Sequence, residues 1–188
     1  MEEKIITHNV TEDKKPSAFD EILEFFEFLV LCFFIFLLVF SFFFRLITVF
    51  GDSMNPTFIH NDRLIVSHLF YEPKNGDVVI ANSYGLNETI IKRVIATEGQ
   101  TLDIDFETGT VTVDGEILTE PYINALTKTN AGAYEYPLVV EDDHVFLLGD
   151  NRNASTDSRS PFVGQVHVDD VIGKVILRVF PLSSIEIF

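Results

Sequence analysis

The sequence has few of the residues that support disulfide bonding or nucleic-acid binding. Its 188 residues include no tryptophan, one cysteine and 13 Lys and Arg against 29 Asp and Glu. A lone cysteine, Cys32, cannot form an intrachain disulfide, so the fold does not depend on disulfides in any compartment. The formal net charge of -16 argues against a nucleic-acid partner, because neutralising phosphates requires clustered basic side chains. A strongly acidic balance is typical of a solvated surface.

Motifs for a metal site or a histidine-based triad are also missing. There is no HExxH motif and no cysteine cluster, so we expect no metal and no other cofactor. The five histidines are His8, His60, His68, His144 and His167. They are scattered, and no Asp or Glu is placed near any of them in a way that suggests a triad. We interpret them as surface or packing residues.

A long apolar segment lies near the N-terminus. Residues 28–44 are apolar except for Ser41, and apolar residues extend the run toward residue 22. A helix over residues 25–47 would be about 34 Å long, which is enough to cross the hydrocarbon core of a bilayer. A cleaved signal peptide fits poorly, because the run is too long and no small-residue cleavage site follows it. The sequence therefore predicts a transmembrane helix at residues 25–47, in which Cys32 faces lipid or packs.

The charges around this helix bear on its orientation. Lys4, Lys14 and Lys15 precede the helix, while Arg45 and Arg63 follow it, a small bias toward a cytoplasmic N-terminus. Long C-terminal domains cross a membrane largely regardless of charge. We therefore expect a cytoplasmic tail at residues 1–24 and an extracytoplasmic domain at residues 48–188. The tail is charged and lacks apolar periodicity, which is typical of disorder.

The region after residue 48 is predicted to be one all-β domain. Short runs of β-branched and large apolar residues, bounded by Gly, Pro, Asn or Asp, lie at residues 64–67, 77–81, 89–96 and 144–148. Residues 111–118 alternate around Asp-Gly, the strongest hairpin signal in the chain. Residues 171–188 are apolar but contain Lys174, Arg178 and Pro181, so we expect a buried strand pair there. Residues 124–137 resemble a surface excursion between strands.

Ser53 is the first candidate for a catalytic residue. It lies in the stretch GDSMNPTF at residues 51–58, eight residues after Arg45 at the end of the apolar segment. A serine between glycine and proline on so short a tether places a hydroxyl close to a membrane surface. A hydroxyl is a weak nucleophile at neutral pH and needs a base within hydrogen-bond reach.

Lys92 is the best candidate for that base. It lies in the apolar run TIIKRVIA at residues 89–96, where Ile90 and Val94 share its face of a strand. Aliphatic neighbours desolvate an ammonium group and so lower its pKa. To act near neutral pH, the pKa of Lys92 would have to fall by about three pH units from about 10.4, at a cost of about 4 kcal/mol. A lone lysine with an ordinary pKa would instead extend from the strand edge into water.

Four segments together resemble a known family. They are GDSMNPT at residues 51–57, GDVV at 76–79, KRVIA at 92–96 and GDNRNASTDSR at 149–159. In this order, behind a membrane anchor, they resemble the bacterial type I signal peptidases of peptidase family S26. Members of that family are membrane-anchored Ser-Lys proteases that remove signal peptides from exported proteins. The similarity extends from about residue 49 to residue 173.

The resemblance implies a role for each matching residue of the dyad and its loop. Ser53 attacks the scissile carbonyl, and neutral Lys92 takes its proton and returns a proton to the leaving amine. Ser155 orients the lysine by hydrogen bonding, and an ion pair between Asp157 and Arg159 fixes the loop that carries Ser155.

Other matching residues are expected to shape the site. Met54, Pro56 and Gly51 pack against the dyad or line the substrate pocket. Residues 150–152 (Asp-Asn-Arg) are interpreted as loop-shaping, because acidic and Asn side chains satisfy backbone groups in turns.

Gly51 departs from the pattern of many family members, especially those of Gram-negative bacteria. These have a serine two positions before the nucleophile, whose hydroxyl helps to bind the oxyanion. With Gly51 in that position, the oxyanion hole must depend on backbone N–H groups, chiefly that of Ser53. The single anchor, the short chain and Gly51 resemble the Gram-positive branch of the family.

The resemblance also implies substrates, partners and location. The partners are preproteins with signal peptides and the lipid bilayer, and the location is the bacterial cell membrane with a single span. Substrate would bind extended, as an added strand, and be cleaved after an Ala-X-Ala sequence. We expect the protein to act as a monomer.

Two other classes of protein compete with this interpretation. One is a different Ser-Lys processing peptidase of the same fold, such as a self-cleaving SOS repressor or a mitochondrial inner-membrane protease. The anchor and the lack of a DNA-binding domain disfavour a repressor, and the acidic tail is a poor transit peptide. The other is a non-catalytic anchored β domain, which would leave Ser53, Lys92 and the 149–159 loop as coincidences.

Overall fold

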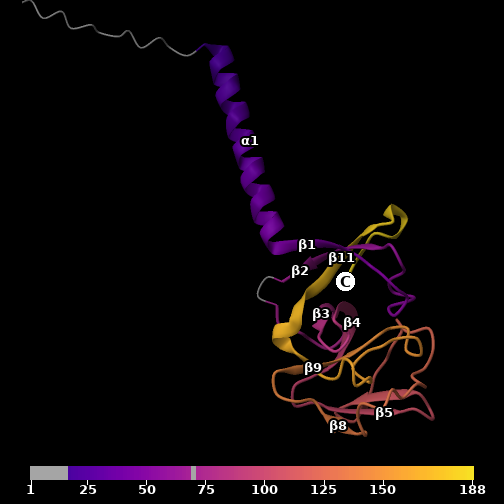
Figure 1. Cartoon of the computed structure of the whole chain (residues 1–188). Coiled ribbons are helices and arrows are strands. Elements are labelled where there is room, and N and C mark those ends of the chain that lie inside the picture. The colour runs from indigo at the N-terminus through magenta and orange to yellow at the C-terminus, as the bar shows by residue number, and fades with distance from the viewer. Residues whose placement is uncertain (1–16, 69–70) are drawn as a thin grey trace, which may run out of the picture. The chain divides into compact units, whose positions relative to one another are not determined.

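The computed structural model describes residues 17–68 and 71–188 (Figure 1). The chain divides into a unit that ends at Ser41 and a unit from Phe42 to Phe188. Residues 1–16, which make up most of the expected cytoplasmic tail, lie outside the described residues.

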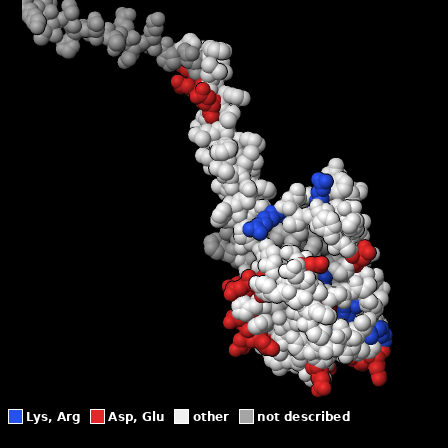
Figure 2. Space-filling model, viewed as in Figure 1, with Lys and Arg blue, Asp and Glu red and all other residues white. Residues whose placement is uncertain are grey.

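Helix α1, Ala18–Phe43, lies in the first unit up to Ser41. Its stretch Glu21–Phe43 has a mean hydropathy of 2.7 with none of it buried, so it is long and apolar enough to cross a membrane. Figure 2 shows the helix surface free of charged side chains except for acidic ones near its N-terminal end. A helix that is apolar around its whole circumference needs an apolar environment rather than water.

The helix boundaries differ from those expected at residues 25 and 47. The helix begins at Ala18 and ends at Phe43, and the next residues form strand β1, Phe44–Thr48. Strand β1 pairs antiparallel with β2, with Phe44 opposite Ser67 and Thr48 opposite Arg63. The sheet thus satisfies the backbone groups of residues 44–48, so the expectation that residues 44–47 belong to the helix is wrong.

The second unit is built of β-strands and two short 3-10 helices, as the sequence predicts for an all-β domain. After β1, the strands are β2 Arg63–Ser67, β3 Val78–Ser83, β4 Glu88–Thr97, β5 Thr101–Asp105, β6 Thr110–Val113, β7 Glu116–Ile117, β8 Leu138–Val139, β9 His144–Leu148, β10 Val166–His167, β11 Val171–Phe180 and β12 Glu186–Ile187. The 3-10 helices are Val168–Asp170 and Leu182–Ser184. The strands expected at residues 64–67, 77–81, 89–96 and 144–148 are confirmed, as is the hairpin around Asp114-Gly115.

Two sheets make up this unit. The larger has the order β1-β2-β11-β3-β4-β9-β10, with β12 paired to β11, and the smaller has the order β7-β6-β5-β8. In Figure 1, β5 and β8 lie at the opposite end of the unit from β1. The expected strand pair at residues 171–188 is formed by β11 and β12. Strand β12 is exposed rather than buried, however, because it covers only the end of β11.

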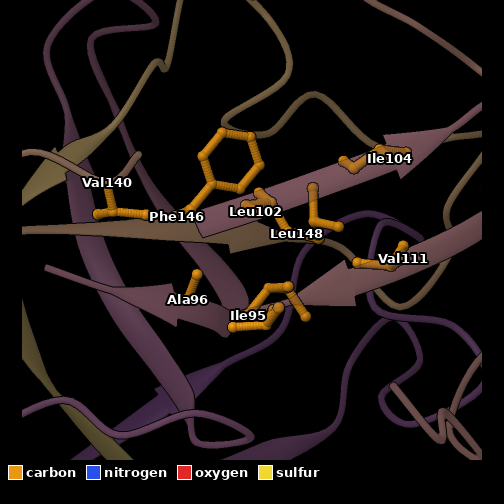
Figure 3. Packing of buried hydrophobic residues seen from close by; sticks show 9 residues of the cluster. Ile95, Ala96, Leu102, Ile104, Val111, Val140, Phe146 and Leu148 are labelled. Atoms are coloured by element: carbon orange, nitrogen blue, oxygen red, sulfur yellow. The ribbon is translucent and has the colours of Figure 1, made fainter. Parts of the chain in front are cut away.

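The hydrophobic core has three clusters, of which one lies between the sheets and another beneath the candidate nucleophile. Residues from β4, β5, β6 and β9 fill the first cluster, in which Phe146 and Leu102 are fully buried (Figure 3). The second cluster contains Met54 and Phe58, packed against Val66 of β2, Ile80 of β3 and other core residues. The second cluster therefore fixes the segment that carries Ser53 onto the larger sheet.

Candidate active site

Ser53 lies in a series of turns whose apolar side chains point into the core. Met54 and Phe58 are 2% and 0% exposed, and the Phe58 N–H donates to the Met54 carbonyl at 2.9 Å. The carbonyl of Ser53 itself accepts the N–H of Asn151 at 3.0 Å, and the Asn151 amide group donates to the Asp52 carbonyl at 3.1 Å. Two sets of contacts thus fix Ser53: the packing of Met54 and Phe58 in the core, and the hydrogen bonds to the loop at residues 149–159.

The structure brings Ser53 and Lys92 together. Nζ of Lys92, on β4, lies 2.9 Å from Oγ of Ser53, although 39 residues separate the two in the sequence. Lys92 is 3% exposed, and its second hydrogen bond, at 3.0 Å, goes to the carbonyl of Ile91. The lysine side chain is therefore almost completely removed from water and aimed at the hydroxyl.

Burial gives Lys92 an unusual pKa for a lysine. Desolvation lowers its pKa from 10.5 to about 8, and the carboxylates of Asp157 and Asp150 partly oppose this by favouring the ammonium. The direction and the cause are those expected from the aliphatic neighbours in the sequence. At this pKa, an appreciable fraction of Lys92 is neutral at pH 7 to 8 and can accept a proton.

An ion pair joins the strand of Lys92 to the 149–159 loop. Arg93 donates to both carboxylate oxygens of Asp150, at 2.8 and 2.6 Å, and both groups are buried. Asp150 also accepts the hydroxyl of Thr57 at 2.5 Å. Asp150 therefore does more than shape a turn, since it connects β4 to the segment that carries Ser53.

A second buried ion pair holds the loop from within. Asp157 and Arg159 lie 2.8 Å apart, with side chains 0% and 1% exposed, as expected from the resemblance. Asp157 also accepts the Gly149 N–H at 3.0 Å, and Arg159 donates to the carbonyl of Arg152 at 2.6 Å. Both charges are therefore compensated within the loop, as buried charges require.

Ser155 does not make the bond expected of it. Its Oγ is buried and has no hydrogen-bond partner among the described residues. The Lys92 bonds given above go to Ser53 and Ile91 instead, and Ser155 packs against Gly149. The hydrogen bond from Ser155 to Lys92 is therefore absent from the structure, and an orienting role for Ser155 stays a prediction.

Gly51 and Pro56 differ in their relation to the site. Gly51 lines the groove beside Ser53 with φ at 85°, a conformation that favours glycine. Its N–H donates to Nδ1 of His60 at 3.3 Å, and the ring of His60 lies edge-on to Phe50, with ring centroids 5.8 Å apart. Pro56 is exposed and does not line this groove, so its expected place in a substrate pocket stays a prediction.

A groove of about 730 Å³ runs beside Ser53 and Lys92. Its two long sides are residues 45–51 and the stretch 88–92 of β4. Strand β1 is an edge of the sheet, and β4 pairs with β9 only from Arg93 onward, so both sides present unpaired strand edges among the described residues. The floor is apolar and includes Val66, Ile80 and Ile172. Free strand edges on both sides of a groove can pair with an extended peptide.

Several residues of the site were missed in the sequence. Four residues contact the site or its supporting loop without being expected to: Thr57, His60, Glu120 and Tyr122. The sequence around each of them does not indicate which residue it contacts. Arg93, next to Lys92, carried the only signal, because a second charge in an apolar strand needs a buried partner.

Comparisons with known proteins agree on one family. The family model described as "Signal peptidase, peptidase S26" matches residues 22–180. A probable signal peptidase I-1 of Synechocystis is 38% identical over 71% of this chain and 69% of its own length. A signal peptidase IB of Staphylococcus aureus is 30% identical over 88% of this chain and 93% of its own length. A solved signal peptidase I from Enterococcus faecalis is 29% identical, covers 55% of this chain and 97% of its own, and has a TM-score of 0.45.

Proposed function

The chain belongs to the S26 signal peptidase family of serine endopeptidases, and we propose that it cleaves signal peptides from exported preproteins with Ser53 as nucleophile and Lys92 as general base. One observation carries the proposal most directly. It is the 2.9 Å separation between Nζ of Lys92 and Oγ of Ser53 at a lysine that is 3% exposed.

The chemistry follows from the protonation state of Lys92. When the lysine is an ammonium, it donates to Oγ of Ser53; when it is neutral, the Ser53 hydroxyl donates to Nζ across the same distance. Neutral Lys92 accepts the proton as Ser53 forms a bond to the scissile carbonyl carbon. The resulting ammonium then gives a proton to the leaving amine, and water releases the acyl group from Ser53 in the second half of the reaction.

The backbone of Ser53 supplies the donor for the developing oxyanion. The Ser53 N–H has no hydrogen-bond acceptor among the described residues, whereas the Gly51 N–H donates to His60. The Ser53 N–H is therefore available to a substrate oxygen, and Gly51 offers neither a side-chain hydroxyl nor a free N–H. A single preorganised donor of this kind is worth roughly 100-fold or more in rate in other serine peptidases.

Substrate specificity follows from the groove. An extended peptide between residues 45–51 and 88–92 can pair with both strand edges, and its alternate side chains then meet the apolar floor. The family preference for Ala-X-Ala fits a groove that offers aliphatic walls and backbone groups. Cleavage after such a sequence is part of the proposal.

Helix α1 completes the proposal as a membrane anchor. It is followed without a linker by β1, and Ser53 comes five residues after the end of β1 at Thr48. We place residues N-terminal to the helix in the cytoplasm and the β unit outside, as a single-pass monomer. Under this arrangement the partners of the enzyme are the bilayer and preproteins whose signal helices lie in it.

The test is cleavage of a model preprotein by the full chain in detergent micelles. The wild type should cut after Ala-X-Ala, as read by N-terminal sequencing of the product. Ser53→Ala and Lys92→Ala should each lower kcat at least about 1,000-fold while the far-UV circular dichroism is unchanged. Lys92→Arg should fail equally, because arginine does not give up its proton to act as a base.

Matched controls distinguish the loss of a dyad residue from a general loss of structure. Ser183→Ala and Lys74→Ala alter an exposed serine and an exposed lysine and should leave kcat within twofold of wild type. Full activity in any of the three dyad variants would rule out the Ser-Lys mechanism. A wild-type chain that binds a preprotein without cutting it would favour the non-catalytic alternative.

A further inference from the structure

The segment at residues 120–133, which overlaps the surface excursion expected at residues 124–137, packs along the loop that supports the dyad. Hydrogen bonds between them include Arg152 Nη1 to Thr127 Oγ1 at 2.9 Å, Asn153 Nδ2 to the Leu126 carbonyl at 3.0 Å, the Lys128 N–H to Asn153 Oδ1 at 2.9 Å, Arg159 Nη1 to the Thr129 carbonyl at 2.9 Å and the Ala133 N–H to the Arg159 carbonyl at 2.9 Å. Thr127 is 0% exposed. The 120–133 segment is therefore a brace for the 149–159 loop.

A row of charged side chains, with an arginine on each side of a central tyrosine ring and a carboxylate at each end, links the brace to the site. Asp150 pairs with Arg93 at 2.6 Å, and the Arg93 guanidinium lies 3.9 Å from the ring centroid of Tyr122. On the other side, the Arg152 guanidinium lies 6.0 Å from the same ring and pairs with Glu120 at 2.5 Å. The Tyr122 hydroxyl donates to Glu120 at 3.2 Å. Tyr122 thus stabilises two like charges that a carboxylate neutralises at each end.

This row of charged side chains is connected to both Lys92 and Ser53. Arg93 is the neighbour of Lys92 on β4, and Asp150 holds the hydroxyl of Thr57, four residues after Ser53. A shift of Arg93 would therefore move both halves of the dyad. It would also change how far the Asp150 charge is neutralised, and that charge raises the pKa of Lys92.

Tyr122 has no other structural duty that the described residues reveal. Tyr134 and Tyr136 pack against the core cluster between the sheets, but Tyr122 belongs to none of the three hydrophobic clusters. Its ring lies near two guanidinium groups, those of Arg93 and Arg152. The role of this half-buried tyrosine is therefore to stabilise the two neighbouring arginines.

We propose that Tyr122 and Glu120 are positioning residues for the Ser-Lys reaction, holding Arg93 and Arg152 so that β4 and the 149–159 loop keep Ser53 and Lys92 in register. This inference rests on the proposed function. Neither residue lines the groove beside Ser53 and Lys92; both act through the arginines.

The test compares variants of the full chain in detergent micelles with a model preprotein. Tyr122→Leu keeps bulk but removes the ring, and should lower kcat at least about tenfold with KM within twofold, because binding does not use the row. Tyr122→Phe keeps the ring over Arg93 and should restore kcat to within about threefold. Glu120→Gln leaves Arg152 without its charge partner and should also lower kcat.

A second readout requires no turnover. The pKa of Lys92, followed by NMR of the lysine side-chain nitrogen, should rise by at least about 0.5 pH unit in Tyr122→Leu. The reason is that Arg93, once released, neutralises Asp150 less completely. In Glu120→Gln the shift should have the opposite sign, since the row then gains net positive charge.

Tyr134→Leu is the matched control, because it removes a half-buried tyrosine of the core cluster outside the row. It should lower the melting temperature about as much as Tyr122→Leu but leave kcat within twofold. Equal losses of kcat in both variants, or an unchanged Lys92 pKa in Tyr122→Leu, would overturn the inference. If the wild type does not cleave at all, the proposed function fails. The change in the Lys92 pKa in Tyr122→Leu would then still test whether Tyr122 positions Arg93.

Discussion

Gly149 lies against Ser155 so closely that no side chain fits between them. A Cβ atom on Gly149 would overlap Oγ of Ser155 and lie 2.5 Å from the carbonyl oxygen of Ser53. Because that carbonyl belongs to the nucleophile itself, even one added methyl group must displace Ser53 or the loop.

Gly149→Ala should therefore lower kcat at least about tenfold, since displacements near 1 Å in a reacting group can cost roughly 100-fold. Steady-state cleavage of a model preprotein measures this. Gly115→Ala is the control, because it strains a hairpin at φ 81° with open space around it, and should affect stability but not kcat. Unchanged kcat in Gly149→Ala would show that the 149–159 loop moves freely relative to Ser53.

The pH dependence of cleavage should report Lys92. Since burial lowers its pKa to about 8 and the base must be neutral, log kcat/KM should rise with a slope of one below about pH 8 and level off above it. Lys74→Met, which alters an exposed lysine, should leave this profile unchanged. A profile that is flat from pH 5 to 9 would exclude a lysine base.

The buried ammonium should also reduce the stability of the fold. The folded pKa of Lys92, about 8, lies below the ordinary value of 10.5, so the unfolded chain binds more protons between these two values and stability rises with pH through that window. Lys92→Met should therefore raise the free energy of unfolding at pH 7 by about 1 to 3 kcal/mol while abolishing activity. The gain should disappear above about pH 10.5; a loss of stability at pH 7 would contradict it.

His60 should support the wall of the groove through its bond to Gly51. His60→Ala removes the acceptor of the Gly51 N–H and should lower kcat/KM about three- to tenfold, as expected for one neutral hydrogen bond. His60→Asn places an oxygen close to the position of Nδ1 and should stay within about twofold of wild type. His167→Asn, at a histidine that caps a 3-10 helix, controls for the loss of an imidazole. Equal activity of His60→Ala and His60→Asn would show that the hydrogen bond between Gly51 and His60 does not support catalysis.

The strands were largely predictable because each depends on a local pattern. The run around Lys92 is rich in β-branched residues and is confirmed as β4, and the Asp114-Gly115 turn is confirmed as a hairpin. The boundary at Phe43 was not predictable, because Phe44, Leu46 and Ile47 continue the apolar pattern beyond the helix and only Arg45 interrupts it. Only pairing with β2, a distant segment, decides that Phe44–Thr48 is a strand.

The candidate site was predictable where neighbouring residues form a motif and not where partners are distant. Asp157 and Arg159 lie two residues apart, so the ion pair between them could be expected. Glu120 meets Arg152 across 32 residues, and Arg93 meets Asp150 across 57. Such pairs depend on which strands and loops become neighbours in the fold, which no local pattern determines.

The buried charges around the dyad have a consequence for tolerance to salt. The ion pairs Arg93–Asp150, Arg152–Glu120 and Asp157–Arg159 have side chains no more than 10% exposed, so mobile ions scarcely reach them. The acidic surface seen in Figure 2, with a net charge of -16 for the chain, is open to counterions. Rising ionic strength should thus relieve repulsion across the exterior while the internal pairs keep their strength. Added salt should therefore leave the ion pairs that support the dyad intact.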